Sequence, residues 1–170
     1  HAQLPLYRAP SLDWALSGQT GVRFNRDDAF RRISRSFHAV KDSEYAPPVS
    51  LQKTLRKYQR DGYRWLRTLD GYGMGGILAD DMGLGKTVQT IAFMLSQADK
   101  GPSLVIAPTS VVPNWENELK KFAPGLRPFI INNIRERAMA VRQTGPGDVV
   151  IASYGVLTNS TEALLERDWN

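Results

Sequence analysis

The chain has 170 residues, of which 42% are hydrophobic, so it is long enough for one domain, or one domain with an appendage, around a real core. It contains no cysteine and only two histidines, which excludes a disulfide, a thiol nucleophile and a zinc cluster and fits an intracellular, cytoplasmic protein. No apolar run approaches the roughly 18 residues that a membrane-spanning helix needs, so no membrane partner is expected.

The chain is basic, with a formal net charge of +5 and a pI near 9.6. Much of the excess charge comes early, in Arg23, Arg26, Arg31, Arg32, Arg35 and Lys41. Such a run is compatible with a polyanionic partner, and it is equally compatible with an ordinary solvated face.

Residues 1–48 differ from the rest because proline and glycine interrupt them before any long period develops. Within them, Phe30, Ile33 and Phe37 recur at helical spacing, which predicts an amphipathic helix over 27–40 packed on a neighbour. Pro47 and Pro48 then favour an extended stretch and a boundary. We therefore expect an accessory region at 1–48 and a second unit at 49–170.

From residue 51 the pattern is that of an α/β fold, in which short apolar strands alternate with helices. The expected helices are 56–69, 86–98, 111–122 and 133–143, and the expected strands are 76–79, 104–107, 129–131 and 149–152. Strands that are apolar on both faces predict a parallel sheet covered by helices. On the first of these helices, we expect Tyr58, Trp65, Leu66 and Leu69 on the buried side.

Residues 80–87, with the sequence DDMGLGKT, lie between an apolar run and a predicted helix. Glycines let backbone N–H groups turn inward, and a helix N-terminus adds partial positive charge, so this turn predicts a phosphate-binding loop for a nucleoside triphosphate. Lys86 would reach the β- and γ-phosphates and Thr87 would hold Mg²⁺. Asp80 stands where the strict P-loop pattern has glycine, and a chance Gly-Lys-Thr at a strand-to-helix turn is the alternative.

Three further segments accompany this loop in order: LRKYQRDGYRWL at 55–66, LVIAPTSVVPNW at 104–115 and DVVIASYG at 148–155. With GGILA at 75–79 and the loop, they closely resemble the opening motifs of the SWI/SNF-type helicase-like ATPases, a group of superfamily-two helicases. The resemblance implies the first part of a RecA-like lobe of the P-loop NTPase class, with ATP and Mg²⁺ as cofactors. Residues 1–48 are similar, less specifically, to the region that precedes the motor in bacterial members.

The resemblance also implies a set of nucleotide-binding residues. They are Arg56, Gln59, Asp81, Met82, Gly83, Leu84, Gly85, Lys86 and Thr87, of which Lys86 and Thr87 would be catalytic. Gln59 falls at the Q-motif position, where an amide can donate and accept at once and so match the adenine edge. A helix-surface glutamine and a solvated Arg56 are the alternatives. Asp80 and Asp81 would repel phosphates if aimed inward, so at least one should point to backbone N–H groups or to water around Mg²⁺.

Four residues are expected at the DNA backbone. Thr109 and Ser110 resemble motif Ia, and Ser153 and Tyr154 resemble motif Ib; hydroxyls at such turns can hold a phosphate without reading sequence. Helix capping by Thr109 or Ser110, and a plain strand terminus at Ser153, are the alternatives. Trp115 and Leu119 should pack their helix on the sheet, whereas Lys120 and Lys121 should be solvated.

The implied parent is an ATP-driven translocase on double-stranded DNA or a nucleoprotein complex, nucleoid-associated if bacterial. Hydrolysis needs acidic residues for Mg²⁺ and a cationic finger, yet the chain has no Asp-Glu dipeptide and no second lobe. We therefore expect it to bind ATP without hydrolysing it, and to self-associate through an unpaired sheet edge or end in a poorly ordered terminus. A non-enzymatic scaffold and a small-molecule kinase are the competing interpretations.

Overall fold

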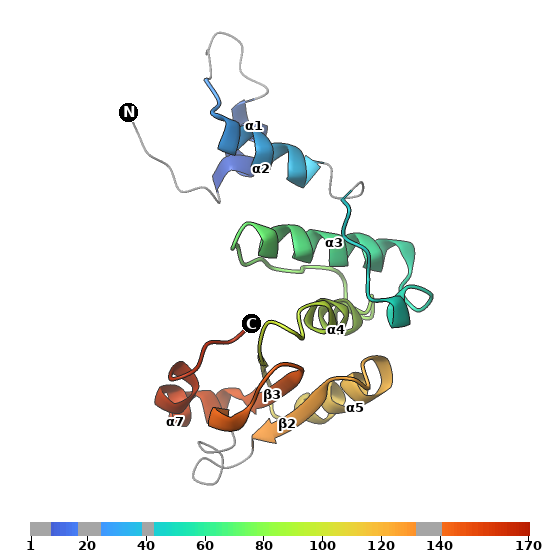
Figure 1. Cartoon of the computed structure of the whole chain (residues 1–170), viewed down its shortest axis with the longest axis vertical. Helices are drawn as coiled ribbons and strands as arrows, with labels where there is room; N and C mark the ends of the chain where they lie inside the picture. Colours follow the sequence, from blue (N-terminus) through green and yellow to red (C-terminus); the bar gives the residue numbers. More distant parts are fainter. Residues whose placement is uncertain (1–7, 17–24, 39–42, 132–140) are drawn as a thin grey trace.

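The computed structural model describes residues 8–16, 25–38, 43–131 and 141–170. Figure 1 shows two short helices at one end, a helical layer in the middle and a sheet with its covering helices at the other end. The elements are α1 (Ala9–Leu16), α2 (Asp28–His38), η3 (Val49–Leu51), α3 (Lys57–Gly71), α4 (Lys86–Ser96), β1 (Ser103–Ala107), α5 (Val112–Phe122), β2 (Arg127–Ile131), β3 (Asp148–Ser153) and α7 (Tyr154–Leu165). The predicted helix at 133–143 lies largely outside the described residues.

The sheet is parallel, with the strand order β1-β3-β2, as the apolar runs predicted. Successive residues of the central strand β3 face opposite sides, so each side has its own core. Val149 and Ile151 join Leu119 of α5 on one side, whereas Val150 and Ala152 join Leu164 of α7 on the other. The α/β fold with helices on both faces of a parallel sheet is confirmed.

Helices α3 and α4 pack on each other through a separate cluster formed by Leu51, Leu55, Tyr63, Val88 and Ala92. Leu69 is buried as expected, and Trp65 and Leu66 are half-buried. The prediction for Tyr58 was wrong, because its side chain is 38% exposed. The buried face of α3 passes through Gln59 and Tyr63 instead, and Tyr58 lies about 100° away from Gln59 around the helix.

The predicted strand at 76–79 is not a strand. These residues have no regular structure, Ile77 is 86% exposed, and the described strands offer them no partner. A Cβ on Gly76 would overlap Leu69 and Trp65, so the segment runs directly against α3 (Figure 1). Of these four residues only Leu78 is half-buried, so the apolar run does not mark a buried strand, and its backbone is not part of the described sheet.

At the other end of the molecule, α2 is the predicted amphipathic helix and packs on α1, a helix that the sequence did not predict. Ile33 and Ser34 are buried, and Asp13 of α1 pairs with Arg26 at 2.7 Å and accepts a hydrogen bond from Ser34. Because α2 also contacts α3, these two helices rest on the helical layer of the larger unit (Figure 1).

Candidate functional site

The phosphate-binding loop was predicted at 80–87, and its last two residues, Lys86 and Thr87, form the start of α4. Gly83 and Gly85 have φ angles of 83° and 76°, a left-handed conformation that residues with a Cβ rarely adopt. Gly85 is also the N-cap of α4, and no side chain caps this helix. The first N–H groups of α4 therefore remain available to an anion at this end of the helix.

The Lys86 ammonium lies across its own loop. Its Nζ donates to the carbonyl oxygens of Asp80 and Asp81, at 2.7 and 3.0 Å. An ammonium has three N–H donors, so two of them close the loop and one is left for a phosphate oxygen. Thr87 is the second residue of α4 and is half-buried beside it.

Gln59 connects the start of α3 to this loop. Its Oε1 accepts from the backbone N–H of Arg56 at 2.9 Å, and its Nε2 donates to the carbonyl of Leu84 at 3.0 Å. A Cβ on Gly85 would lie 2.5 Å from Gln59 Nε2, so a larger residue here would displace the Gln59 amide from the Leu84 carbonyl, in addition to the cost of its positive φ. Gln59 thus braces the loop in this structure, and its Nε2 also donates a long hydrogen bond of 3.5 Å to the Tyr58 hydroxyl. Its role at an adenine edge stays a prediction. Arg56 is exposed.

The orientation of Asp80 depends on a residue that the sequence did not single out. Gln89 of α4 is fully buried and donates from Nε2 to Asp80 Oδ2 at 3.2 Å. A Cβ on Gly62 of α3 would overlap Gln89 Oε1, so Gly62 makes room for this side chain. The signal available in the sequence was a glycine inside a predicted helix, which is costly unless packing requires it. Asp80 therefore faces a side-chain amide. That at least one of Asp80 and Asp81 faces backbone N–H groups or water around Mg²⁺ stays a prediction.

The four candidate DNA-backbone residues lie at the carboxyl-terminal end of the sheet. Ala107 and Ser153 are aligned at the carboxyl ends of the neighbouring strands β1 and β3. Thr109 and Ser110 follow the first strand and are exposed, and Tyr154 follows the second with 58% of its surface exposed. No hydrogen bond between described residues joins this group to the phosphate loop.

Their local roles differ. The N-cap of α5 is Val111, without a side-chain capping bond, so capping by Thr109 or Ser110 does not occur. The Ser153 hydroxyl accepts from the Val156 N–H at 3.3 Å, and Tyr154 opens α7, a helix that was not predicted. Trp115 and Leu119 pack α5 on the sheet as expected, while Lys120 and Lys121 are exposed.

The described residues could hold Mg²⁺ only with few protein ligands, as a phosphate-binding loop does. Within these parts of the chain there is no group of three or more histidine or carboxylate side chains that could hold a metal by itself. Mg²⁺ commonly takes one or two protein ligands and completes its shell with phosphates and water, so a single hydroxyl from Thr87 beside the loop is compatible with it. No described helix is long and apolar enough to cross a membrane.

Comparison with known proteins agrees with this geometry. The model of the SNF2-related domain matches residues 58–170. The chain belongs to the SNF2-related domain family. The matched part of this SNF2-related chain includes Gln59, the phosphate loop and both edge segments, whereas α1 and α2 lie outside it.

Individual relatives extend this finding. The putative ATP-dependent helicase/translocase YwqA of Bacillus subtilis is 39% identical over 91% of this chain and 18% of its own length. The probable ATP-dependent DNA helicase CHR23 of Arabidopsis thaliana is 36% identical over 82% of this chain and 14% of its length. The SWI2/SNF2 ATPase core of Sulfolobus solfataricus, solved in complex with double-stranded DNA, matches with a TM-score of 0.60 and 43% identity over 68% of this chain and 24% of that one.

The chain therefore spans less than a quarter of the length of each of these relatives. Since plant, bacterial and archaeal proteins all match, the bacterial-type resemblance of residues 1–48 stays a prediction.

Proposed function

We propose that this chain is the ATP-binding part of a DNA-dependent ATPase or translocase that remodels nucleoprotein complexes. The observation that supports it most is the loop at 80–87. Two of its glycines have the left-handed conformation, its Lys86 ammonium bonds to the carbonyl of Asp80, and a helix starts at that lysine. Family membership fits the same function.

In this proposal the loop amides and the N-terminus of α4 hold the triphosphate, and Lys86 donates to its terminal oxygens. Thr87 provides the hydroxyl ligand for Mg²⁺, which when bound neutralises charge on the transferring phosphoryl group. Gln59 and Gln89 keep the loop in place through Leu84 and Asp80. The accessory region at 1–48 and the lobe at 49–170 are part of the same proposal.

Double-stranded DNA is the proposed partner because the Sulfolobus relative was solved with it. Thr109, Ser110, Ser153 and Tyr154 would contact phosphates from the edge at which β1 and β3 end. Contacts of hydroxyl groups to phosphates position a protein on DNA without reading its sequence, which suits a translocase.

The test uses the full-length parent protein. Lys86→Ala should abolish ATP hydrolysis stimulated by double-stranded DNA, because the variant loses the cation that contacts the phosphates. Lys100→Ala is a suitable control, since Lys100 lies beyond α4, where it pairs with Asp70. Hydrolysis that persists in Lys86→Ala at the level of the control would contradict the proposal.

For the 170-residue chain alone, we propose binding of ATP without turnover, because the sequence contains no Asp-Glu dipeptide to hold Mg²⁺ and orient water. We also propose weak self-association through β1 or β2, the outer strands of the sheet. A sedimentation coefficient that rises with protein concentration would support this contact, and a constant value would contradict it.

A further inference from the structure

We propose that the outer face of α2 binds the phosphate backbone of double-stranded DNA. This contact would be additional to that of the four candidate residues at the carboxyl ends of β1 and β3. This face, which we call the arginine ridge, carries Arg31 and Arg35. The proposal rests on the DNA partner proposed above, and it concerns a helix outside the part of the chain that matches the family model.

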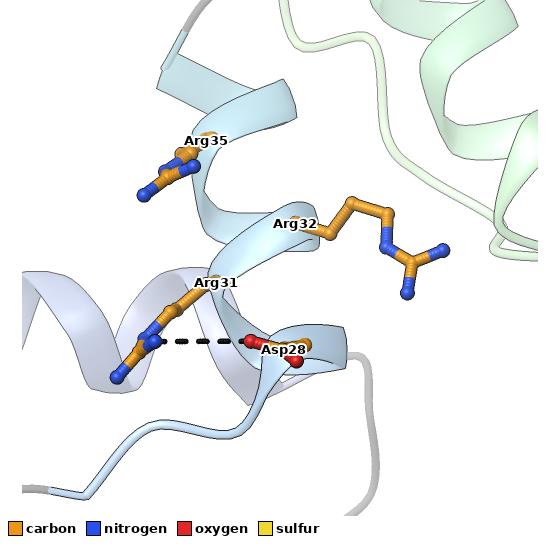
Figure 2. Close-up of a pocket in the computed structure, with 4 residues that line it drawn as sticks. All are labelled: Asp28, Arg31, Arg32 and Arg35. Carbon is orange, nitrogen blue, oxygen red and sulfur yellow. Dashed lines mark ion pairs between the residues drawn. The ribbon is translucent and has the colours of Figure 1, made fainter.

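The ridge follows from the period of the helix. Positions 28, 31, 32 and 35 fall within about 100° of one another around α2, on the side opposite the buried Ile33. They line an open hollow of about 500 Å³. Figure 2 shows Arg31 and Arg35 extending from the same side of α2, while Arg32 extends toward the other side.

The charges of Arg31 and Arg35 are only weakly balanced by the residues that the structure describes. Like charges at i and i+4, such as those of Arg31 and Arg35, destabilise a helix slightly. Asp28 approaches Arg31 at 3.7 Å, but its side chain is 92% exposed, and an exposed pair of this kind contributes little. Within the described part of the chain, Arg35 has no ion pair.

A neighbouring arginine shows how this region neutralises a cation that it needs for folding. Arg26 contacts the partly buried carboxylate of Asp13 at 2.7 Å, and Asp13 also accepts a bond from Ser34. Arg31 and Arg35 have no such partner in the described residues, and both side chains point outward (Figure 2). Both guanidinium groups are therefore accessible to an anion supplied from outside the chain.

The spacing favours DNA over an isolated anion. Arg31 and Arg35 are separated by about 6 Å along the helix axis, over which one DNA strand presents about two phosphates. Guanidinium groups form bidentate hydrogen bonds with phosphate oxygens. Because α2 packs on α1 and contacts α3, the ridge is held on the body that carries the phosphate loop, and DNA contacts made here would be transmitted to it.

The experiment measures binding of the 170-residue chain to a 30-base-pair duplex of arbitrary sequence over a range of salt concentrations. The double variant Arg31→Gln/Arg35→Gln should reduce the magnitude of the slope of log K against log salt by about 2, and weaken binding about ten-fold or more near 0.1 M salt. Lys53→Gln/Arg142→Gln removes the same charge from exposed positions elsewhere and should leave the slope nearly unchanged. Arg31→Lys/Arg35→Lys should restore most of the slope.

Two results would overturn the proposal. One is an unchanged slope in Arg31→Gln/Arg35→Gln while the wild type binds the duplex, which leaves the proposed function intact. The other is a wild type that binds polyglutamate and not the duplex, which would identify an acidic protein segment as the occupant. Stabilisation by Mg-ATP, measured on the same samples, reports on the nucleotide site independently. An unchanged melting temperature of the double variant excludes misfolding as the cause.

Discussion

The two ends of the molecule use their polar side chains in opposite ways. In the α/β unit, Gln59 and Gln89 are buried, and their side chains bond to Leu84 and Asp80 of the loop at 80–87, so buried polar groups shape this loop from within. In the α1–α2 pair Asp13, Arg26 and Ser34 form such a network, while Arg31 and Arg35 of the arginine ridge are exposed. In the proposals made above, the first arrangement serves a small ligand, the nucleotide, and the second serves a large one, the DNA.

The largest effect should come from the core of the α/β unit. Leu119→Ala removes a fully buried side chain between α5 and the sheet and should lower the free energy of unfolding by about 2 to 5 kcal/mol. Ile33→Ala in α2 is the comparison, and it should reduce hydrogen-exchange protection in α1 and α2 while leaving the sheet protected. Equal loss of sheet protection in both variants would show that the two regions unfold as one.

The second prediction separates the two glycines of the phosphate loop. Gly83→Ala and Gly85→Ala both impose a positive φ on alanine, which costs about 1 kcal/mol or more. Only the Cβ at position 85 meets Gln59, because nothing lies within 4 Å of the one at position 83. Gly85→Ala should therefore be more destabilising by about 1 kcal/mol or more in chemical denaturation. Equal losses would mean that Gln59 does not brace the loop.

The smallest and most local effect is expected at Asp13. Asp13→Ala leaves Arg26 and Ser34 without their carboxylate and should loosen α1 against α2 by about 1 to 3 kcal/mol. Segment-resolved hydrogen exchange should show faster exchange in α1 and α2 only. Faster exchange in β3 as well would mean that this network supports the whole molecule.

Local patterns predicted much of the fold. The Gly-Lys-Thr sequence marked the start of α4 at Lys86, and the apolar runs located β1 and β3. The same kind of run misled at 76–79, where Ile77 is exposed and the backbone lies against α3, because an apolar run alone does not show that its residues pair in a sheet. In α7 the apolar residues fall in two clusters, at Val156–Leu157 and at Leu164–Leu165, which gave no clear period.

The site was predicted less completely than the fold. The loop and its lysine can be found from spacing, since the glycines and the helix start lie next to one another in the chain. The bonds of Gln59 to Leu84 and of Gln89 to Asp80 depend on how α3 packs on α4, and they join residues that no sequence pattern pairs. The exposure of Tyr58 likewise depends on which face of α3 packs on α4, and the sequence does not determine this face.

Thermal stabilisation by Mg-ATP tests the central claim most directly, because it needs only this chain. At about 100 times its dissociation constant, the ligand should add about 2.7 kcal/mol to the stability of the wild type and almost nothing to that of Lys86→Ala. No shift of the wild type at millimolar Mg-ATP, or an equal shift in both proteins, would contradict a phosphate-binding role for the loop at 80–87.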